Sequence, residues 1–166
     1  SLLITLLNNC DRVKIACLAQ LVNVLAPIMT ETNGRCWVQT IFYPFMYTSK
    51  YGRGTALRTF CNCDSYDTEK MKNIPYLDAA AVISENENEI SVFVVNRSMT
   101  DEAALAVDMF GFDEYNVSEH IALEGDDLKA INTADDPNHV VPVTKDVSRG
   151  IMLAPHSWNM ILFRKQ

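Results

Sequence analysis

The sequence lacks a concentrated basic surface and a long apolar run. Its 166 residues carry a formal net charge of −7, and the basic residues form only two small clusters, Lys50 with Arg53 and Arg164 with Lys165. A protein that binds a phosphate backbone needs a larger basic patch. No apolar run approaches the roughly 20 residues that cross a bilayer as a helix. We therefore expect neither nucleic acid nor a membrane as a partner.

The sequence also lacks an even set of cysteines. It has five, all within the first 63 residues: Cys10, Cys17, Cys36, Cys61 and Cys63. A secreted disulfide framework usually has an even number, so we expect free thiols in a reducing cytoplasm. Cys61-Asn62-Cys63 is too tightly spaced for zinc, and His120 and His156 have no Cys or His at ligand spacing. No metal site is predicted.

The first part of the chain, up to about residue 56, has the pattern of an α/β unit. Ser1 to Leu7 predicts the end of a helix, which Asn8 and Asn9 stop. The run from Val13 to Val24 is almost continuously apolar, which is typical of a strand buried on both faces, although a helix of that length is also possible. A second helix is predicted from Tyr43 to Tyr51, ending at Gly52.

The remainder, from about residue 57, predicts only strands. Two β-rich runs, Leu77 to Ser84 and Glu89 to Asn96, flank a polar turn and predict a hairpin. Further strands are expected over 103–109, 115–124, 140–143, 150–153 and 157–163, with a polar loop over 125–138. In the run from Tyr115 to Glu124, strict alternation would place Tyr115, Val117, Ile121 and Leu123 on one face. Short strands of this kind are typical of a β-sandwich.

These segments resemble a known family in the order in which they occur. DRVKIACLAQLVNVLAPIMTE, Asp11 to Glu31, is similar to the end of the catalytic barrel of family 51 glycoside hydrolases, the α-L-arabinofuranosidases. TIFYPFMYTSKYGRGTAL, Thr40 to Leu57, resembles the last helix of that barrel and its exit. PYLDAAAV, VFVVNRS and SWNMILF, in residues 75–82, 92–98 and 157–163, resemble the carboxy-terminal sandwich of the family.

The resemblance implies both a fold and a parent activity. The fold would be mainly β: a jelly-roll-like sandwich over residues 57–166, preceded over residues 1–56 by the last βα unit of a (β/α)8 barrel. The activity would be that of a retaining hydrolase that releases terminal α-L-arabinofuranosyl groups from arabinoxylan, arabinan or their oligosaccharides. The family usually assembles as a hexamer, and no metal or organic cofactor is implied.

The carboxylates of such a hydrolase are not found in this sequence. A retaining glycosidase needs two of them, about 5 Å apart. In the family they come from earlier strands, and the acid/base Glu follows an Asn. The only Asn-Glu pairs here, Asn86-Glu87 and Asn88-Glu89, lie in or beside the predicted hairpin turn, and Glu31 is expected to be a solvated loop residue. We therefore expect no catalytic residue in this chain.

Gln20 is the best candidate for substrate binding. It is a polar residue in the apolar run, near the carboxyl end of the predicted strand, and this end faces the active site in barrels. The matching Gln of the family bonds to the arabinose. The alternative is a core Gln that neighbouring backbone groups satisfy. Asn23 is a second candidate of the same kind, but a role in capping the exit of the strand is favoured for it.

Two other functional classes remain open. One is a carbohydrate-binding module, which would show exposed aromatic side chains on a sheet face; Trp158 is instead expected to be buried. The other is a structural sandwich that supports a barrel and its oligomer. Arg97 is expected to pair with an acidic neighbour. The aromatic residues of the second helix could form a sugar platform, but helical spacing favours a core role: Tyr43, Phe45, Tyr47 and Tyr51.

Overall fold

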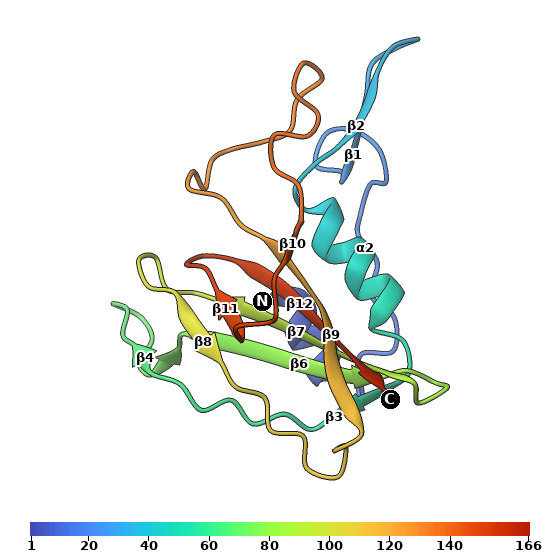
Figure 1. The fold of residues 1–166 in the computed structure, drawn as a ribbon. Helices are drawn as coiled ribbons and strands as arrows, with labels where there is room; N and C mark the ends of the chain where they lie inside the picture. The colour runs from blue at the N-terminus through green and yellow to red at the C-terminus, as the bar shows by residue number, and fades with distance from the viewer.

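The computed structural model describes all of residues 1–166 and is mainly β, as predicted (Figure 1). Its two helices are α1 (Leu2–Asn8) and α2 (Phe42–Tyr51). Both end where the sequence predicted: Asn9 follows α1, and the N–H of Gly52 closes α2 by donating to the Thr48 carbonyl at 2.8 Å. No helix is long and apolar enough to span a membrane.

The strands are short in the first half of the chain and longer in the second. They are β1 (Ile28–Thr30), β2 (Cys36–Val38), β3 (Thr55–Leu57), β4 (Ser65–Tyr66), β5 (Ile74–Pro75), β6 (Leu77–Ile83), β7 (Glu89–Asn96), β8 (Ala103–Leu105), β9 (Tyr115–Leu123), β10 (Val143–Lys145), β11 (Ile151–Leu153) and β12 (Trp158–Lys165). The strand predicted over 103–109 is confirmed only for its first three residues.

Six strands form one antiparallel sheet in the order β10-β9-β12-β7-β6-β3. The predicted hairpin is its centre: β6 and β7 pair with Leu77 opposite Asn96 and Ile83 opposite Ile90. The turn between them is tied by the Ser84 hydroxyl, which donates to Asn86 Oδ1 at 2.8 Å. The polar turn therefore fixes the register, and the apolar runs bury both faces.

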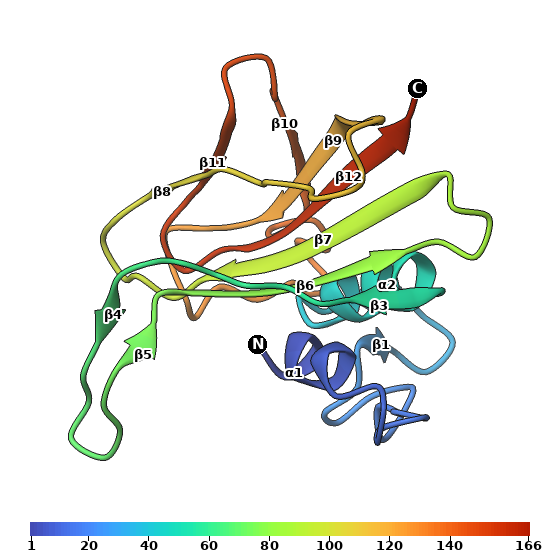
Figure 2. The ribbon, with the colours of Figure 1, turned by 90° about the horizontal axis from the view of Figure 1, so that it is seen from below.

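Each face of this sheet has its own apolar core. On one face, a core of ten buried residues includes Val92, Val94 and Ile161, and the small β8–β11 ribbon covers it. On the other face, Phe93 and Met160 belong to a second core that the helices cover. Figure 2 shows the ribbon on one side of the sheet and α1 and α2 on the other. Alternate residues of one strand thus serve opposite cores, which is what a pleated strand buried on both faces requires.

The predicted alignment of β9 is wrong. Tyr115 and Val117 pack in the first core, whereas Ile121 and Leu123 pack in the second. The reason is a β-bulge: β12 pairs Leu162 with Glu119 but Phe163 with Val117, which leaves Ser118 as an extra residue. One extra residue moves every side chain beyond it to the other face. The Ser118 hydroxyl donates to the Leu162 carbonyl at 3.0 Å and so ties the bulge to β12.

The helices pack against the sheet at its second core. Ile4 of α1 is fully buried there, and the Asn8 side-chain amide donates to the Ala79 carbonyl of β6 at 2.9 Å. Tyr47 of α2 lies 5.9 Å from the Trp158 ring, centroid to centroid. Trp158 is buried, as predicted, and so it does not form a sugar platform.

Candidate functional site

The segment that carries the predicted binding residue is irregular and exposed. Between α1 and β1, the only ladder contact is a single bridge from Val22 to Ile28, so the predicted strand over Val13–Val24 is wrong for this chain. A strand buried on both faces needs a hydrogen-bonded neighbour at each edge. None of the other strands in these 166 residues supplies one. The apolar composition of the segment favours a buried strand, but the partners that such a strand needs are not in this chain.

Several residues of this segment adopt left-handed backbone conformations. Gln20 has a φ of 59°, Asn23 of 62° and Val24 of 60°. Asn enters this region readily, but a β-branched residue such as Val does so only with strain. Asn23 also ties the following turn, because its side chain accepts from Thr30 N at 2.7 Å and donates to Thr30 Oγ1 at 3.0 Å. Asn23 therefore does not cap a strand as predicted, because that strand is absent; it ties the turn that leads into β1 instead.

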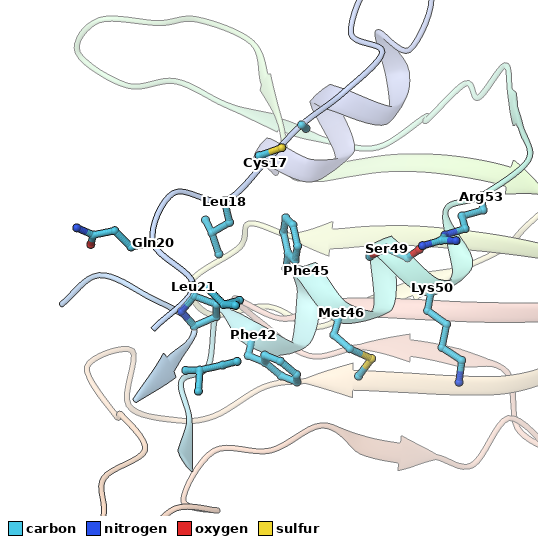
Figure 3. A pocket seen from close by; sticks show the side chains of 13 residues that line it. Cys17, Leu18, Gln20, Leu21, Phe42, Phe45, Met46, Ser49, Lys50 and Arg53 are labelled. Atoms are coloured by element: carbon cyan, nitrogen blue, oxygen red, sulfur yellow. The ribbon is translucent and has the colours of Figure 1, made fainter. Parts of the chain in front are cut away.

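An apolar groove separates this segment from α2. It has a volume of about 750 Å³ and is lined by Ala16, Cys17, Leu18, Gln20, Leu21, Pro27, Ile28, Phe42, Phe45, Met46, Ser49, Lys50 and Arg53. Figure 3 shows Leu18 and Leu21 on one side of it and Phe45 and Met46 on the helix opposite. Gln20 lies at its far edge, where its exposed amide points away from α2. The residues that line the groove include no carboxylate and no imidazole.

The carboxylates that the sequence singled out all have structural partners or turn positions. Glu31 forms a bidentate pair with Arg35, whose Nη2 and Nε lie 2.9 and 3.0 Å from the carboxylate oxygens. The hydrogen bonds from this guanidinium lower the pKa of Glu31. Glu87 sits in the β6–β7 turn with a φ of 55°, and Glu89 pairs with Arg164 at 2.9 Å. The interpretation as turn residues is confirmed for Asn86, Glu87 and Asn88, whereas Glu89 is the first residue of β7.

Asn132 is a structural centre that the sequence did not reveal. It is 1 % exposed although it lies in the long polar loop between β9 and β10. Its carbonyl accepts from Trp37 Nε1 at 3.1 Å and from Gln39 Nε2 at 3.0 Å. Its side chain bonds to the Val38 carbonyl and to both backbone groups of Val140. These partners on the β1–β2 side lie 93 to 95 positions away in the chain, so no local pattern could identify them.

The histidines and cysteines do not gather into a reactive or metal-binding cluster. No group of three or more His, Cys, Asp or Glu side chains is placed to hold a metal ion. His120 is buried with its Nε2 2.9 Å from Asn159 Oδ1. All five cysteines are free thiols, as predicted. Burial and the neighbouring Cys63 raise the pKa of Cys61 to about 11, so this thiol is a poor nucleophile at neutral pH.

The remaining predicted contacts are structural. Arg97 pairs with Asp78, with Nη2 2.6 Å from the carboxylate, as expected for an acidic neighbour. Tyr47 and Tyr51 stack on each other and pack against the second core, where burial raises the pKa of Tyr47. Phe45 lines the groove instead. Tyr47 and Tyr51 are therefore half-buried against a core, as predicted, whereas Tyr43 and Phe45 belong to neither core.

An antiparallel sheet with an apolar core on each face defines the architecture of this chain as a β domain. The family model described as "Alpha-L-arabinofuranosidase C-terminal domain" matches residues 1–157. The chain belongs to this family.

The relatives are arabinofuranosidases. The chain is 48 % identical, over its whole length, to an intracellular exo-α-(1→5)-L-arabinofuranosidase of Halalkalibacterium halodurans, and 47 % identical to an enzyme of that description from Bacillus subtilis. It spans about a third of the length of each, 34 %. An exo-α-(1→6)-L-arabinofuranosidase of Bifidobacterium longum is 43 % identical over 96 % of the chain.

Solved structures of the same family share the fold. The family 51 α-L-arabinofuranosidase AbfB of Bifidobacterium longum superposes with a TM-score of 0.91 at 35 % identity, covering 98 % of this chain and 32 % of that one. The family 51 enzyme of Thermotoga petrophila gives 0.81 at 28 % identity, covering 96 % of this chain and 36 % of that one. The fold predicted for the carboxy-terminal sandwich is confirmed by these matches.

Proposed function

We propose that this chain is the carboxy-terminal portion of an α-L-arabinofuranosidase and that it supports catalysis without performing it. The observation that carries this proposal is the match of residues 1–157 to a carboxy-terminal domain of that enzyme. Residues 1–56 would supply the last βα unit of the catalytic barrel, and residues 57–166 would form the sandwich. The two catalytic carboxylates would come from the part of the enzyme that precedes these residues.

The exposed apolar segment supports this division. Ile15, Leu21, Val24 and Leu25 are each at least 70 % exposed, next to the apolar groove of α2. So large an apolar surface favours a protein partner over water. In the proposed enzyme the preceding barrel strands would cover it, and the run from Val13 to Val22 would take the extended conformation that its composition favours, while the turn from Asn23 to Thr30 would keep the contacts seen here.

Gln20 would then bind the sugar. In an extended strand its backbone would leave the left-handed conformation seen here, and its side chain could reach the carboxyl end of the barrel, where substrates bind. An amide can both donate to and accept from sugar hydroxyls. The resemblance of DRVKIACLAQLVNV to the family supports this role for Gln20. A core role for Gln20 would need buried backbone partners, whereas its amide is exposed in this chain.

The names of the relatives support a proposal for the substrate and the location. Their names describe intracellular enzymes that act on arabinofuranosyl linkages, so we propose a cytoplasmic enzyme that trims arabinose-containing oligo- or polysaccharides. A homo-oligomer, hexameric in the family, is proposed on the resemblance alone. A carbohydrate-binding module remains the alternative; against it, Trp158 is buried, and Trp37 is half-buried with its Nε1 bonded to the Asn132 carbonyl.

Hydrolysis of an aryl α-L-arabinofuranoside tests the proposal. The natural full-length protein should turn over, and the 166-residue chain should not, because it contributes no carboxylate pair. The intact mass of the natural protein, measured in parallel, reports whether a barrel precedes these residues. Turnover by the isolated chain that disappears when one of its own carboxylates is replaced would contradict the proposal.

Gln20→Ala in the full-length enzyme tests the binding role. Loss of one hydrogen bond to a neutral sugar should cost on the order of 1 kcal/mol, or roughly a fivefold lower kcat/KM, and more if the bond tightens in the transition state. Gln166→Ala, the same change at the exposed end of β12, is the matched control and should leave kcat/KM unchanged. Equal kinetics for both variants would favour the structural role for Gln20.

A further inference from the structure

The β9–β10 loop, residues 124–142, lies beside the β1–β2 hairpin and is hydrogen-bonded to it. In Figure 1 this loop and the hairpin rise together beyond one end of the sheet. Asn132 makes five hydrogen bonds to Trp37, Val38, Gln39 and Val140, all between 2.7 and 3.1 Å. A buried amide whose donors and acceptors are all satisfied is rigid, and removal of any partner leaves a buried polar group unpaired.

A second contact lies nearer the tip of the hairpin. Arg35 reaches across to the loop, where Nη1 donates to Asp135 Oδ1 at 2.7 Å and to the Ala134 carbonyl at 3.0 Å. The same guanidinium holds Glu31 on its own hairpin. The loop therefore contacts the hairpin at two places. The buried Asn132 bonds near its base, and the exposed Arg35 bonds nearer its tip. We call these contacts the clasp: Arg35, Trp37, Gln39, Asn132 and Asp135.

The hairpin connects directly to the segment of Gln20. Thr30, the last residue of β1, is bound at its N–H and its hydroxyl by the Asn23 side chain. The Asn23 N–H in turn donates to the Ile28 carbonyl at 2.8 Å. Gln20 is three residues before Asn23, so a displacement of the hairpin moves the backbone that carries Gln20. An unbroken set of hydrogen bonds thus runs from Asn132 to the turn behind Gln20.

We infer that the β9–β10 loop is a positioning element for the sugar subsite, with Asn132 as its positioning residue. The sandwich thereby contributes to arabinose recognition through the clasp, without itself touching the sugar. This inference rests on the proposed function of Gln20. Displacement of a substrate contact by about 1 Å can cost up to a hundredfold in rate, so a clasp of this kind has kinetic consequences.

Hydrogen exchange on the natural full-length protein tests the clasp independently of any activity. Asn132→Ala should raise exchange of residues 20–39 by about tenfold or more while the central strands β6, β7 and β12 keep their protection, because the substitution frees the hairpin and leaves the sheet intact. Asn138→Ala is the matched control: Asn138 lies in the same loop, is exposed and has no hydrogen-bond partner. Unchanged exchange of residues 20–39 in Asn132→Ala overturns the inference.

Measurements of kcat/KM distinguish a positioning role of Asn132 from a general loss of stability. In the full-length enzyme, Asn132→Ala should lower kcat/KM about fivefold, and the loss should shrink when Gln20 is already Ala, because both changes remove the same sugar contact. Additive losses would mean that Asn132 does not act through Gln20 and would overturn the inference. Should Gln20→Ala alone have no effect, the proposed sugar contact is wrong, and hydrogen exchange then decides for or against the clasp.

A milder variant keeps the test informative if Asn132→Ala does not fold. Trp37→Phe retains an aromatic ring but replaces the indole by a smaller phenyl group and so removes the Nε1 donor to the Asn132 carbonyl. It should raise exchange of residues 28–39 and lower kcat/KM in the same direction as Asn132→Ala, but by less. A folded Trp37→Phe enzyme with wild-type exchange and wild-type kcat/KM overturns the inference.

Discussion

Strand β7 and the segment Val13–Val24 are similarly apolar, yet they end in opposite environments. In β7, Ile90, Phe93 and Val94 are no more than 1 % exposed. In the segment, Ile15 is 83 % and Leu21 70 % exposed. Apolar content therefore does not decide which of the two runs is buried in this chain.

The two runs differ in the neighbouring strands with which they can pair. β7 has β6 on one side and β12 on the other, and β6 is joined to it by a short polar turn. The segment has a single bridge to Ile28. Backbone groups that find no partner within the chain stay in water, and the side chains stay with them. A strand of a parallel barrel needs neighbours from other βα units, so its burial is a property of the whole barrel.

Among the substitutions that test this difference, replacement of Phe93 should lower the free energy of unfolding most. Phe93→Ala removes a fully buried ring from the second core and should lower the free energy of unfolding by about 3–5 kcal/mol. Phe110→Ala is the matched control, since Phe110 is 91 % exposed and should change stability by about 0.5 kcal/mol or less. Urea unfolding of both variants measures this, and similar losses would mean that the sheet core is not the stabilising unit.

Gly54 joins the two regions, and its replacement should give the next largest effect. It has a φ of +130°, and a Cβ there would lie 2.0 Å from the Ile83 carbonyl oxygen. Gly54→Ala should therefore cost roughly 2 kcal/mol or more, from strain and from loss of the β3–β6 pairing. Gly111→Ala has positive φ but open space, so strain alone should cost about 1 kcal/mol. Equal costs in thermal unfolding would contradict the close approach at Gly54.

The sequence predicted the elements whose determinants are local. The β6–β7 hairpin was predictable because the turn residues and both apolar runs lie within 20 consecutive residues. The ends of both helices were predictable because Asn9 and Gly52 stop them locally. The faces of β9 were not, because the bulge at Ser118 is defined by its pairing with β12, more than 40 residues further on.

The contacts of the candidate site were likewise not predictable where they join residues that are distant in the sequence. The sequence identified Gln20 by its resemblance to a family motif, and the polar loop of residues 125–138 was predicted as a loop. It did not reveal that this loop contains a buried Asn132 or that Arg35 reaches Asp135, because both contacts join residues more than 90 positions apart. A polar residue in a polar loop gives no sign of burial until its distant partners are placed.

Self-association of the isolated chain should distinguish the two regions in solution. The exposed apolar segment beside α2 should cause concentration-dependent association, which sedimentation velocity measures. Ile15→Lys with Leu25→Lys should weaken it, because charge disfavours burial of these positions. Phe60→Lys with Phe110→Lys is the control at two similarly exposed positions in the sheet region, and it should leave association unchanged. Equal loss in both double variants would mean that association does not depend on the segment.

The smallest effect is expected from the pH dependence of the β1–β2 hairpin. Hydrogen bonds from Arg35 lower the pKa of Glu31 from its ordinary value of 4.5. A carboxyl with a lowered folded pKa contributes stability that is fully present above 4.5 and is lost as the pH falls through the folded value. The hairpin should therefore loosen below pH 4.5 while the buried strands β6, β7 and β12 keep their protection. Hydrogen exchange across that range measures it.

Glu31→Gln should abolish the dependence, whereas Glu85→Gln, at an exposed turn position, should leave it intact. A hairpin whose exchange changes with pH equally in all three proteins would mean that the Glu31–Arg35 pair does not stabilise it.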